Sequence, residues 1–218
     1  GYWEETKSPA ASPGLKIDTM PHQLLSLGLG RWVWNATDNK FDFETDENVD
    51  NEYSFMFKPA KYTDRLVGDE ETNTNPSFVN SQIQQAFFFS NRLGFLTSDN
   101  ISMSQAGEFN NFFHVSALTV IASDPVDISC SSIRPALLSG VVPVAQGLLL
   151  FSRTQQFLLY SDDGNISPED SIISTISNYD YDIDIEPVSS GTRVNFISKT
   201  KIGAVNQPVV GYSTQDSY

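Results

Sequence analysis

Short runs of alternating apolar and polar residues recur along this 218-residue chain, and turn-forming residues separate them. Such alternation is typical of β-strands that bury one face. Helix-forming residues are sparse, whereas Ser, Thr, Asn, Val, Ile and aromatic residues are plentiful. The pattern therefore predicts an all-β fold.

The clearest hairpin in the first part of the chain joins Arg31–Asn35 to Lys40–Glu44 through the turn at 36–39. Strict alternation puts four aromatic residues on one face of this hairpin: Trp32, Trp34, Phe41 and Phe43. We expect them to pack into a core. On one side of it lies the segment His22–Leu27, which we expect to end at the glycines 28 and 30. On the other side, Tyr53–Phe57 returns to alternation.

The middle of the chain is rich in Phe and Leu. Ala86–Leu96 reads as one strand, Ser98–Asn100 as a turn, and Ile101–Ser104 as the returning strand of a hairpin. A β-branched segment, Val115–Ala122, predicts a further strand before Asp124 and Pro125 interrupt the pattern.

A second hairpin, Leu148–Arg153 with Gln156–Tyr160, echoes the first. Phe-Ser at 89–90 recurs at 151–152 and Phe-Leu at 95–96 recurs at 157–158, an offset of 62 in both cases (152 − 90 and 157 − 95). A third echo begins at Val194–Ser198. Because propeller blades repeat about every 40–50 residues, the offset predicts irregular β-propeller-like blades with an insertion.

These patterns divide the chain into three parts. Residues 1–80 form an N-terminal β region with the hairpin at 31–44 and long acidic connectors, residues 81–140 a first blade-like unit, and residues 141–218 a second unit with the start of a third. The chain begins Gly-Tyr-Trp without Met, so we expect it to be a piece of a longer polypeptide.

The net charge of −14 and the pI near 4.3 argue against nucleic-acid binding, which needs basic surfaces to neutralise phosphates. An acidic surface is typical of a well-solvated protein, and it also suits a channel that DNA must pass without sticking. No apolar run approaches the length of a membrane span. The single cysteine, Cys130, excludes an internal disulfide, and we expect it to be a small buried apolar residue.

The segment Tyr179–Glu186 alternates acidic and apolar residues. On a strand, four carboxylates would share one face: Asp180, Asp182, Asp184 and Glu186. Three interpretations remain open for this face. It is a solvent-facing edge that blocks aggregation, a wall that repels phosphates, or a divalent-cation site.

Arg92 lies within an apolar strand pattern. An unpaired buried charge is very costly, so we expect a structural ion pair, with Asp69 and Asp127 as candidate partners.

Sequence motifs for catalysis are missing: we find no nucleophile elbow, zinc-binding HExxH, P-loop or CxxC. Asp162–Asn165 lacks the ligand spacing of a calcium loop and predicts a turn. The sequence therefore predicts no cofactor and no enzymatic activity. Two alternatives stay open, a glycan-degrading enzyme with two carboxylates across a cleft and a glycan-binding fibre-type module that exposes Trp32 and Trp34.

Short motifs occur in an order that resembles a known family. They are Trp3-Glu4-Glu5, Met20-Pro21-His22, Arg65 with Gly68-Asp69, Asn75-Pro76-Ser77-Phe78, Asn91-Arg92-Leu93-Gly94-Phe95-Leu96 with Ser104 and Phe112, and Asp124-Pro125-Val126-Asp127. Their collinearity over residues 1–160 resembles the tail tubular protein B family, the tail nozzle proteins of short-tailed bacteriophages (podoviruses).

The resemblance implies a structural protein of the virion tail with propeller-like blades, cut from a longer chain. Members assemble as a six-fold ring below an adaptor ring, conduct the double-stranded genome during ejection, and help to hold the tail fibres. The four carboxylates between 180 and 186 would then be candidates for a surface facing the channel or a neighbouring subunit.

Overall fold

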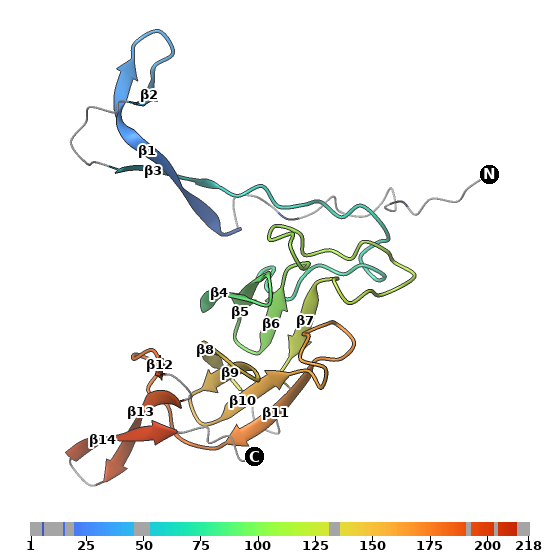
Figure 1. Ribbon diagram of the computed structural model, residues 1–218, viewed down its shortest axis with the longest axis vertical. Helices are drawn as coiled ribbons and strands as arrows, with labels where there is room; N and C mark the ends of the chain where they lie inside the picture. The colour runs from blue at the N-terminus through green and yellow to red at the C-terminus, as the bar shows by residue number, and fades with distance from the viewer. Residues whose placement is uncertain are drawn as a thin grey trace. The chain divides into compact units, whose positions relative to one another are not determined.

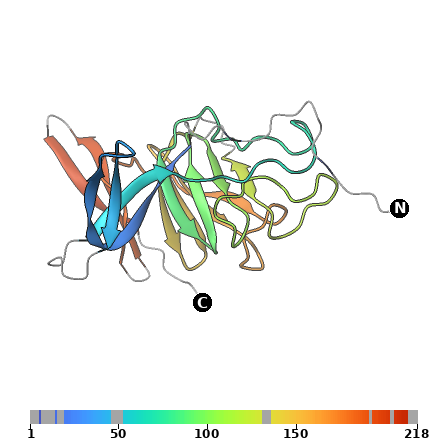
Figure 2. The same cartoon turned by 90° about the horizontal axis from the view of Figure 1, so that it is seen from above.

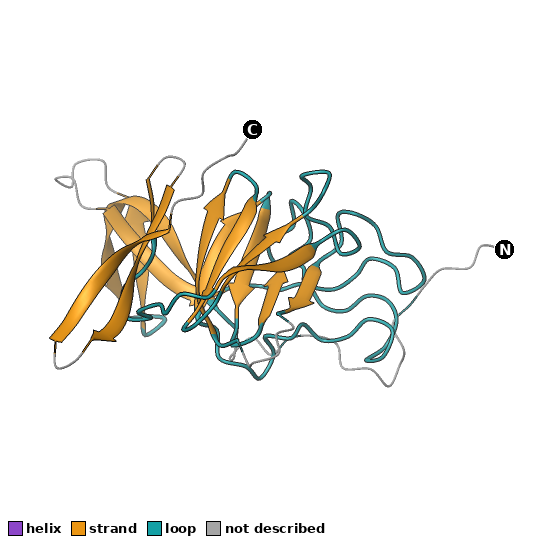
Figure 3. Cartoon of the chain, turned by 90° about the horizontal axis from the view of Figure 1, so that it is seen from below, coloured by secondary structure: helices purple, strands orange, loops and turns teal. Residues whose placement is uncertain are grey.

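The computed structural model describes residues 6, 15, 20–45, 53–130, 136–190, 193–202 and 205–212. Their regular structure is entirely β (Figure 3), which confirms the predicted all-β class. None of these residues belongs to a helix that is long and apolar enough to cross a membrane. The strands are β1 (His22–Asn35), β2 (Lys40–Thr45), β3 (Tyr53–Pro59), β4 (Gln85–Phe89), β5 (Arg92–Leu96), β6 (Asn100–Met103), β7 (Val126–Ser129), β8 (Leu138–Val144), β9 (Gly147–Ser152), β10 (Gln156–Tyr160), β11 (Ile172–Ser177), β12 (Val188–Ser190), β13 (Arg193–Ile202) and β14 (Val205–Tyr212).

The chain divides into two compact units, which are described separately. Residues Leu15–Tyr62 form one unit, and Gly1–Gly14 together with Thr63–Tyr218 form the other. The smaller unit contains β1, β2 and β3, which we call the ribbon. The larger unit contains all the other strands (Figure 1).

In the ribbon, β1 is a single long strand whose two halves pair with different partners. β2 pairs antiparallel with residues 30–35, and β3 pairs with residues 22–29. The predicted hairpin at 31–44 is therefore confirmed. The expectation that the first segment ends at Gly28 is wrong, because a register shift between Ser26 and Gly28 lets the strand continue, and Gly28 adopts a φ of +81° that glycine tolerates.

The predicted aromatic pairs are present, but they do not form a core. Trp32 lies opposite Phe43 and Trp34 opposite Phe41, with ring centroids 5.4 and 5.0 Å apart. Trp34 nevertheless remains 49% exposed. Among the described residues of the ribbon strands only Gly30 is buried. The expectation of core packing is therefore wrong here, because no second layer covers the aromatic side chains within this unit.

The first sheet of the larger unit is an antiparallel meander in the order β4-β5-β6-β7. Ala86–Leu96, predicted as one strand, is itself the hairpin β4–β5. Ser90 and Asn91 adopt φ values of 49° and 57°, which is the left-handed conformation that a two-residue hairpin turn requires. The predicted pairing of this region with residues 101–103 is confirmed as β5–β6.

A second meander, β8 to β11, packs against the first sheet. The predicted hairpin at 148–160 is its β9–β10 pair. One face of each sheet contributes to a shared apolar core, in which Leu96, Ile101 and Met103 of the first sheet meet Leu148 and Leu150 of the second. Every residue of β9 is buried, so this strand of the second sheet is covered on both faces.

The other face of the second sheet packs on the third, which has the order β12-β13-β14. This smaller core joins Leu149 and Phe151 to Tyr181, Val194 and Phe196. The strand expected near residues 194–198 is thus part of β13.

The first three strands of the two meanders correspond at offsets of 53 to 56 residues: β4 to β8 (138 − 85), β5 to β9 (147 − 92) and β6 to β10 (156 − 100). The fourth strands, β7 and β11, correspond at an offset of 46 (172 − 126). The offset of 62 relates β4–β5 to β9–β10, which are not equivalent pairs in their sheets. The sequence echo therefore identified two similar hairpins that occupy different positions in their sheets, because apolar composition alone does not define a strand's position in its sheet.

Candidate functional site

The acidic segment 179–186 is a loop between β11 and β12, not a strand. Asp180, Asp184 and Glu186 are exposed, whereas Asp182 is buried. The Asp182 carboxylate accepts a hydrogen bond from the Asp184 backbone N–H at 3.2 Å, and its backbone N–H donates to Ile197 at 2.8 Å. The expectation that four carboxylates share one face of a strand is therefore wrong, because the segment is a loop and Asp182 is buried.

Tyr181 explains why this segment leaves the extended conformation. Its ring packs against Phe151 and Phe196, and its hydroxyl donates a 2.8 Å hydrogen bond to the carbonyl of Ile185. Burial, followed by the negative charges of Glu186 and Asp182, raises the pKa of Tyr181 to about 12. Burial of this ring and the turn at Asp182 leave three carboxylates in solvent. No cluster of three or more His, Cys, Asp or Glu suited to a metal ion occurs among the described residues.

Arg92 is buried, as expected, but its hydrogen bonds go to backbone carbonyls. Its guanidinium donates to Ser104, Ala122, Ser123 and Asp124 at 2.6–3.2 Å. Burial lowers the pKa of Arg92, and the charge of Asp124 opposes that shift. Arg92 therefore ties the loop 104–125 to the end of the first sheet.

The two carboxylates expected beside Arg92 have other hydrogen-bond partners. Asp127 accepts two 2.6 Å hydrogen bonds, from the backbone N–H and hydroxyl of Ser77, and a third from Ser102 at 3.2 Å. Asp69 accepts from the backbone N–H groups of Thr72 and Glu71, and the bond from Thr72 is the main cause of its lowered pKa. The carboxylate near Arg92 is instead Asp124, from the same motif as Asp127.

Asp124 holds the same loop from inside. Its fully buried carboxylate accepts hydrogen bonds from the N–H groups of Ile121 at 3.1 Å and Val115 at 3.4 Å, and it lies 3.3 Å from Nδ1 of His114. The predicted strand at 115–122 is wrong, since the loop wraps around this carboxylate instead of pairing with a strand.

Arg65 performs a similar role in the preceding loop, and sequence reasoning gave it no role beyond the motif. Its Nε donates to the carbonyl of Asn73, another guanidinium nitrogen donates to the Asn75 side chain, both at 2.8 Å, and the guanidinium lies 5.0 Å from the ring centre of Phe113. The sequence signal for this role is its position in a polar connector in which the Asn75 side chain can accept one of its hydrogen bonds.

These two loops gather at one end of the first sheet (Figure 2). They expose apolar side chains. Leu118 is 82% exposed. We call this set the loop patch, and it consists of Leu66, Val115, Leu118, Val120 and Ile121. A cavity of about 630 Å³ adjoins it, with Leu66, Val67, Phe113 and Val115 among its lining residues. The patch is apolar, although the side chains that hold its two loops in place, Arg65, Arg92 and Asp124, are polar and buried.

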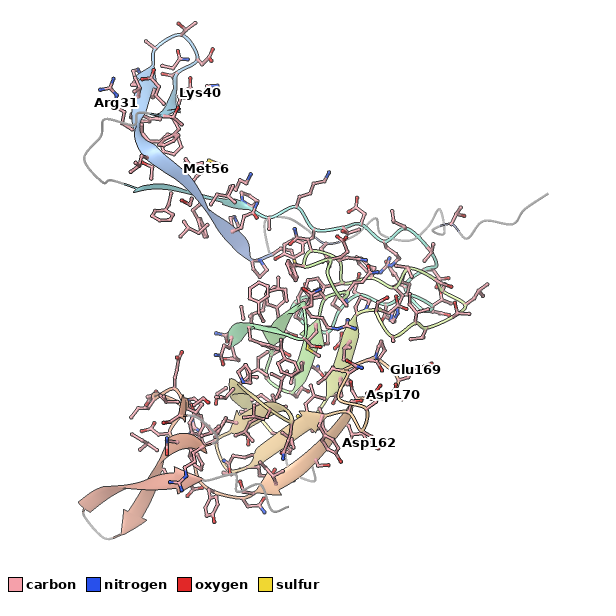
Figure 4. The ribbon with its side chains drawn as sticks, in the orientation of Figure 1. Arg31, Lys40, Met56, Asp162, Glu169 and Asp170 are labelled. Atoms are coloured by element: carbon pink, nitrogen blue, oxygen red, sulfur yellow. The ribbon has the colours of Figure 1, made fainter. Side chains whose placement is uncertain are left out.

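Two smaller predictions are confirmed. Cys130 is buried, and burial raises the pKa of its thiol to about 12. Asp162–Asn165 is a turn in which Asp163 accepts hydrogen bonds from Ser161 and Asn165, and the Ser161 bond is the main cause of its lowered pKa. Figure 4 shows the exposed carboxylates Asp162, Glu169 and Asp170 on the connection between β10 and β11.

Comparison with known proteins agrees with the resemblance seen in the motifs. The sequence matches the family described as bacteriophage nozzle protein over residues 1–216. It is 31% identical over 196 residues to the tail tubular protein gp12 of Escherichia phage T7, an alignment that covers 90% of this chain and 22% of that relative. The chain thus spans about a fifth of the relative's length. The chain belongs to the bacteriophage nozzle protein family.

Proposed function

We propose that this chain is one segment of a nozzle subunit that assembles into a ring-shaped tube and conducts the phage genome during ejection. The family match over nearly the whole chain carries the proposal. The stack of β-sheets supports it, because rigid sheets locked by two apolar cores suit a load-bearing wall. Family membership favours this role over a glycan-binding or glycan-degrading module.

Within the subunit, the sheets are the blades of an irregular propeller: β4–β7 form the first blade, β8–β11 the second and β12–β14 the start of a third. Two consecutive four-stranded meanders packed face to face, followed by a third sheet, support this arrangement. The first strands of the three sheets also lie near one another, with β8 contacting both β4 and β12, as inner strands do around a propeller axis. The rest of the longer chain supplies the closing blades.

The subunits form a six-fold ring below an adaptor protein, and the outer side of the ring holds the tail fibres. A ring built from one kind of chain needs two different contact surfaces on every copy. The action of such a tube on DNA is geometric and electrostatic, so it requires neither an enzymatic site nor a cofactor.

The exposed carboxylates of the 179–186 loop, Asp180, Asp184 and Glu186, face the path of the DNA. Their charge adds to the net charge of −14, and like charges keep the phosphate backbone from adhering to the wall. Asp182 does not belong to this surface, because it is buried in the turn that shapes the loop.

Genome release from purified virions tests the proposal. Virions made without the parent protein should lack a functional nozzle and release no DNA when triggered, and normal release would contradict the nozzle function. In complemented virions, the triple variant Asp180→Asn, Asp184→Asn, Glu186→Gln should slow DNA release severalfold, most strongly at low salt.

A matched control neutralises three other exposed carboxylates, Asp162→Asn, Glu169→Gln and Asp170→Asn. It should leave the release rate unchanged. Equal behaviour of the two triple variants would contradict the assignment of the 179–186 loop to the DNA path while leaving the nozzle function standing.

A further inference from the structure

The ribbon lacks a hydrophobic core of its own. β1 pairs with β3 over residues 22–29 and with β2 over residues 30–35, so each part of the ribbon is only two strands wide. A two-stranded ribbon is at best marginally stable in water. Six of its large apolar side chains are exposed, in two clusters along its length: Leu24, Phe55 and Phe57 in one, and Trp32, Trp34 and Phe41 in the other.

The exposed area is large enough for a specific interface. Phe57 is 70% exposed and Trp34 is 49% exposed. If a complete side chain of this size buries about 200 Å², the two clusters leave on the order of 700 Å² uncovered. A standard protein interface buries roughly 800 Å² on each partner, so covering the ribbon matches the size of one stable contact.

The loop patch of the larger unit has the properties of a receiving surface. Its side chains are aliphatic and exposed, and the cavity beside it is lined partly by Leu66 and Phe113. The backbone beneath it is fixed in advance by Arg92, Asp124 and Arg65. A preformed surface loses little conformational entropy on binding.

Charges of opposite sign lie beside the loop patch and beside the end of the ribbon that carries Phe57. At the other end of the ribbon, the cations already pair with carboxylates of the ribbon itself, Arg31 with Glu44 and Lys40 with Asp38 and Asp42. Lys58 belongs to the ribbon and Lys61 follows it, both exposed or half-buried. The exposed residues Asp64 and Glu71 lie in the loop that carries Leu66, and this loop approaches the 115–121 loop where Gly68 meets Ala117. Such rim charges orient an encounter more than they strengthen it.

We propose that the ribbon of one copy packs on the loop patch of the neighbouring copy in the ring. The inference rests on the proposed tube, because a closed ring needs two different surfaces on each copy, and these two apolar surfaces lie on different compact units of one chain. The occupant of the ribbon's aromatic clusters is therefore a second copy of this chain.

Photo-crosslinking in the assembled full-length protein tests this contact. Rings are formed from a mixture of isotopically light and heavy chains that carry Phe57→p-benzoylphenylalanine, and crosslinked peptides are identified by mass spectrometry. We expect products that join position 57 of one isotope to residues 115–121 of the other. The same probe at Thr37, an exposed turn residue of the ribbon, should not give them. Crosslinks within single chains only, or to segments outside the 115–121 loop, would overturn the proposal.

Ring yield provides the second measurement. Phe57→Asp and Leu118→Asp should each lower the yield of rings at least tenfold, whereas Thr37→Asp should not change it. The midpoint of thermal unfolding of the larger unit should be unchanged in all three variants. Normal rings from Phe57→Asp would overturn the ribbon contact but leave the nozzle function standing. If the unaltered protein forms no ring and no light–heavy crosslink, the proposed function fails as well.

Discussion

Arg92 Nη1 donates a 2.6 Å hydrogen bond to the backbone carbonyl of Asp124, while the Asp124 carboxylate accepts the N–H of Ile121 from within the same loop. Asp124 thus accepts a hydrogen bond from Arg92 through its backbone carbonyl, and it accepts a hydrogen bond from its own loop through its side chain. Through this pairing, hydrogen bonds tie a long irregular connection to the first sheet.

Removing the arginine should therefore destabilise the loop and the first sheet together. Arg92→Met keeps the volume but leaves buried carbonyls without donors, and each such loss costs about 1–3 kcal/mol. We expect the free energy of unfolding to fall by about 3 kcal/mol in a denaturant titration. Arg153→Met, at an exposed position, should change it by less than about 0.5 kcal/mol, and equal effects would contradict the assigned role of Arg92.

Tyr181 should make stability depend on alkaline pH. Its pKa is raised from 10.0 to about 12, so the folded state favours the neutral phenol. That contribution is complete below pH 10 and is lost as the pH rises from 10 to 12. Tyr181→Phe should lose less stability over this window than the unaltered protein, although Tyr62, whose pKa is also about 12, retains part of the effect. Parallel loss in both proteins would rule out Tyr181 as a source.

Gly94 should tolerate no side chain, because a Cβ there would overlap the ring of Phe87. Overpacking of this kind costs about 1–3 kcal/mol. Gly94→Ala should lower the midpoint of denaturant unfolding, and the double variant with Phe87→Leu should recover part of the loss. Additive costs in the double-mutant cycle would show that the two positions do not contact.

Cys130 should report the integrity of the core. Burial, with the charge of Asp99, raises its thiol pKa to about 12, and only the thiolate reacts rapidly with alkylating agents. Iodoacetamide at pH 8 should leave Cys130 unmodified in the native protein and modify it fully in denaturant, as measured by peptide mass spectrometry. Rapid modification of the native protein would contradict its burial.

Local pattern predicted the strands well where alternation and turn chemistry agree. The hairpin at 31–44 and the pair β9–β10 were found because polar turn residues lie between apolar runs. Ala86–Leu96 was read as one strand because Ser90 and Asn91 look unremarkable in a Phe-rich run. Only their positive φ angles reveal the turn.

The site was harder to predict because its geometry depends on distant segments. Alternation at 179–186 predicted a strand, but the burial of Tyr181 against Phe196 overrides the local pattern. The need to satisfy the charge of Arg92 was foreseen, but four backbone carbonyls from a loop 12 to 32 residues away could not be read from sequence. The exposure of the ribbon's aromatic residues likewise could not be predicted, because it depends on whether a second layer of the same unit covers them, and local alternation does not show this.

The mass of the assembled full-length protein, measured by native mass spectrometry with and without the adaptor protein, tests the central claim most directly. A ring of six copies, formed alone or on the adaptor, is the result that the nozzle function predicts. A stable monomer or trimer that is indifferent to the adaptor would contradict it.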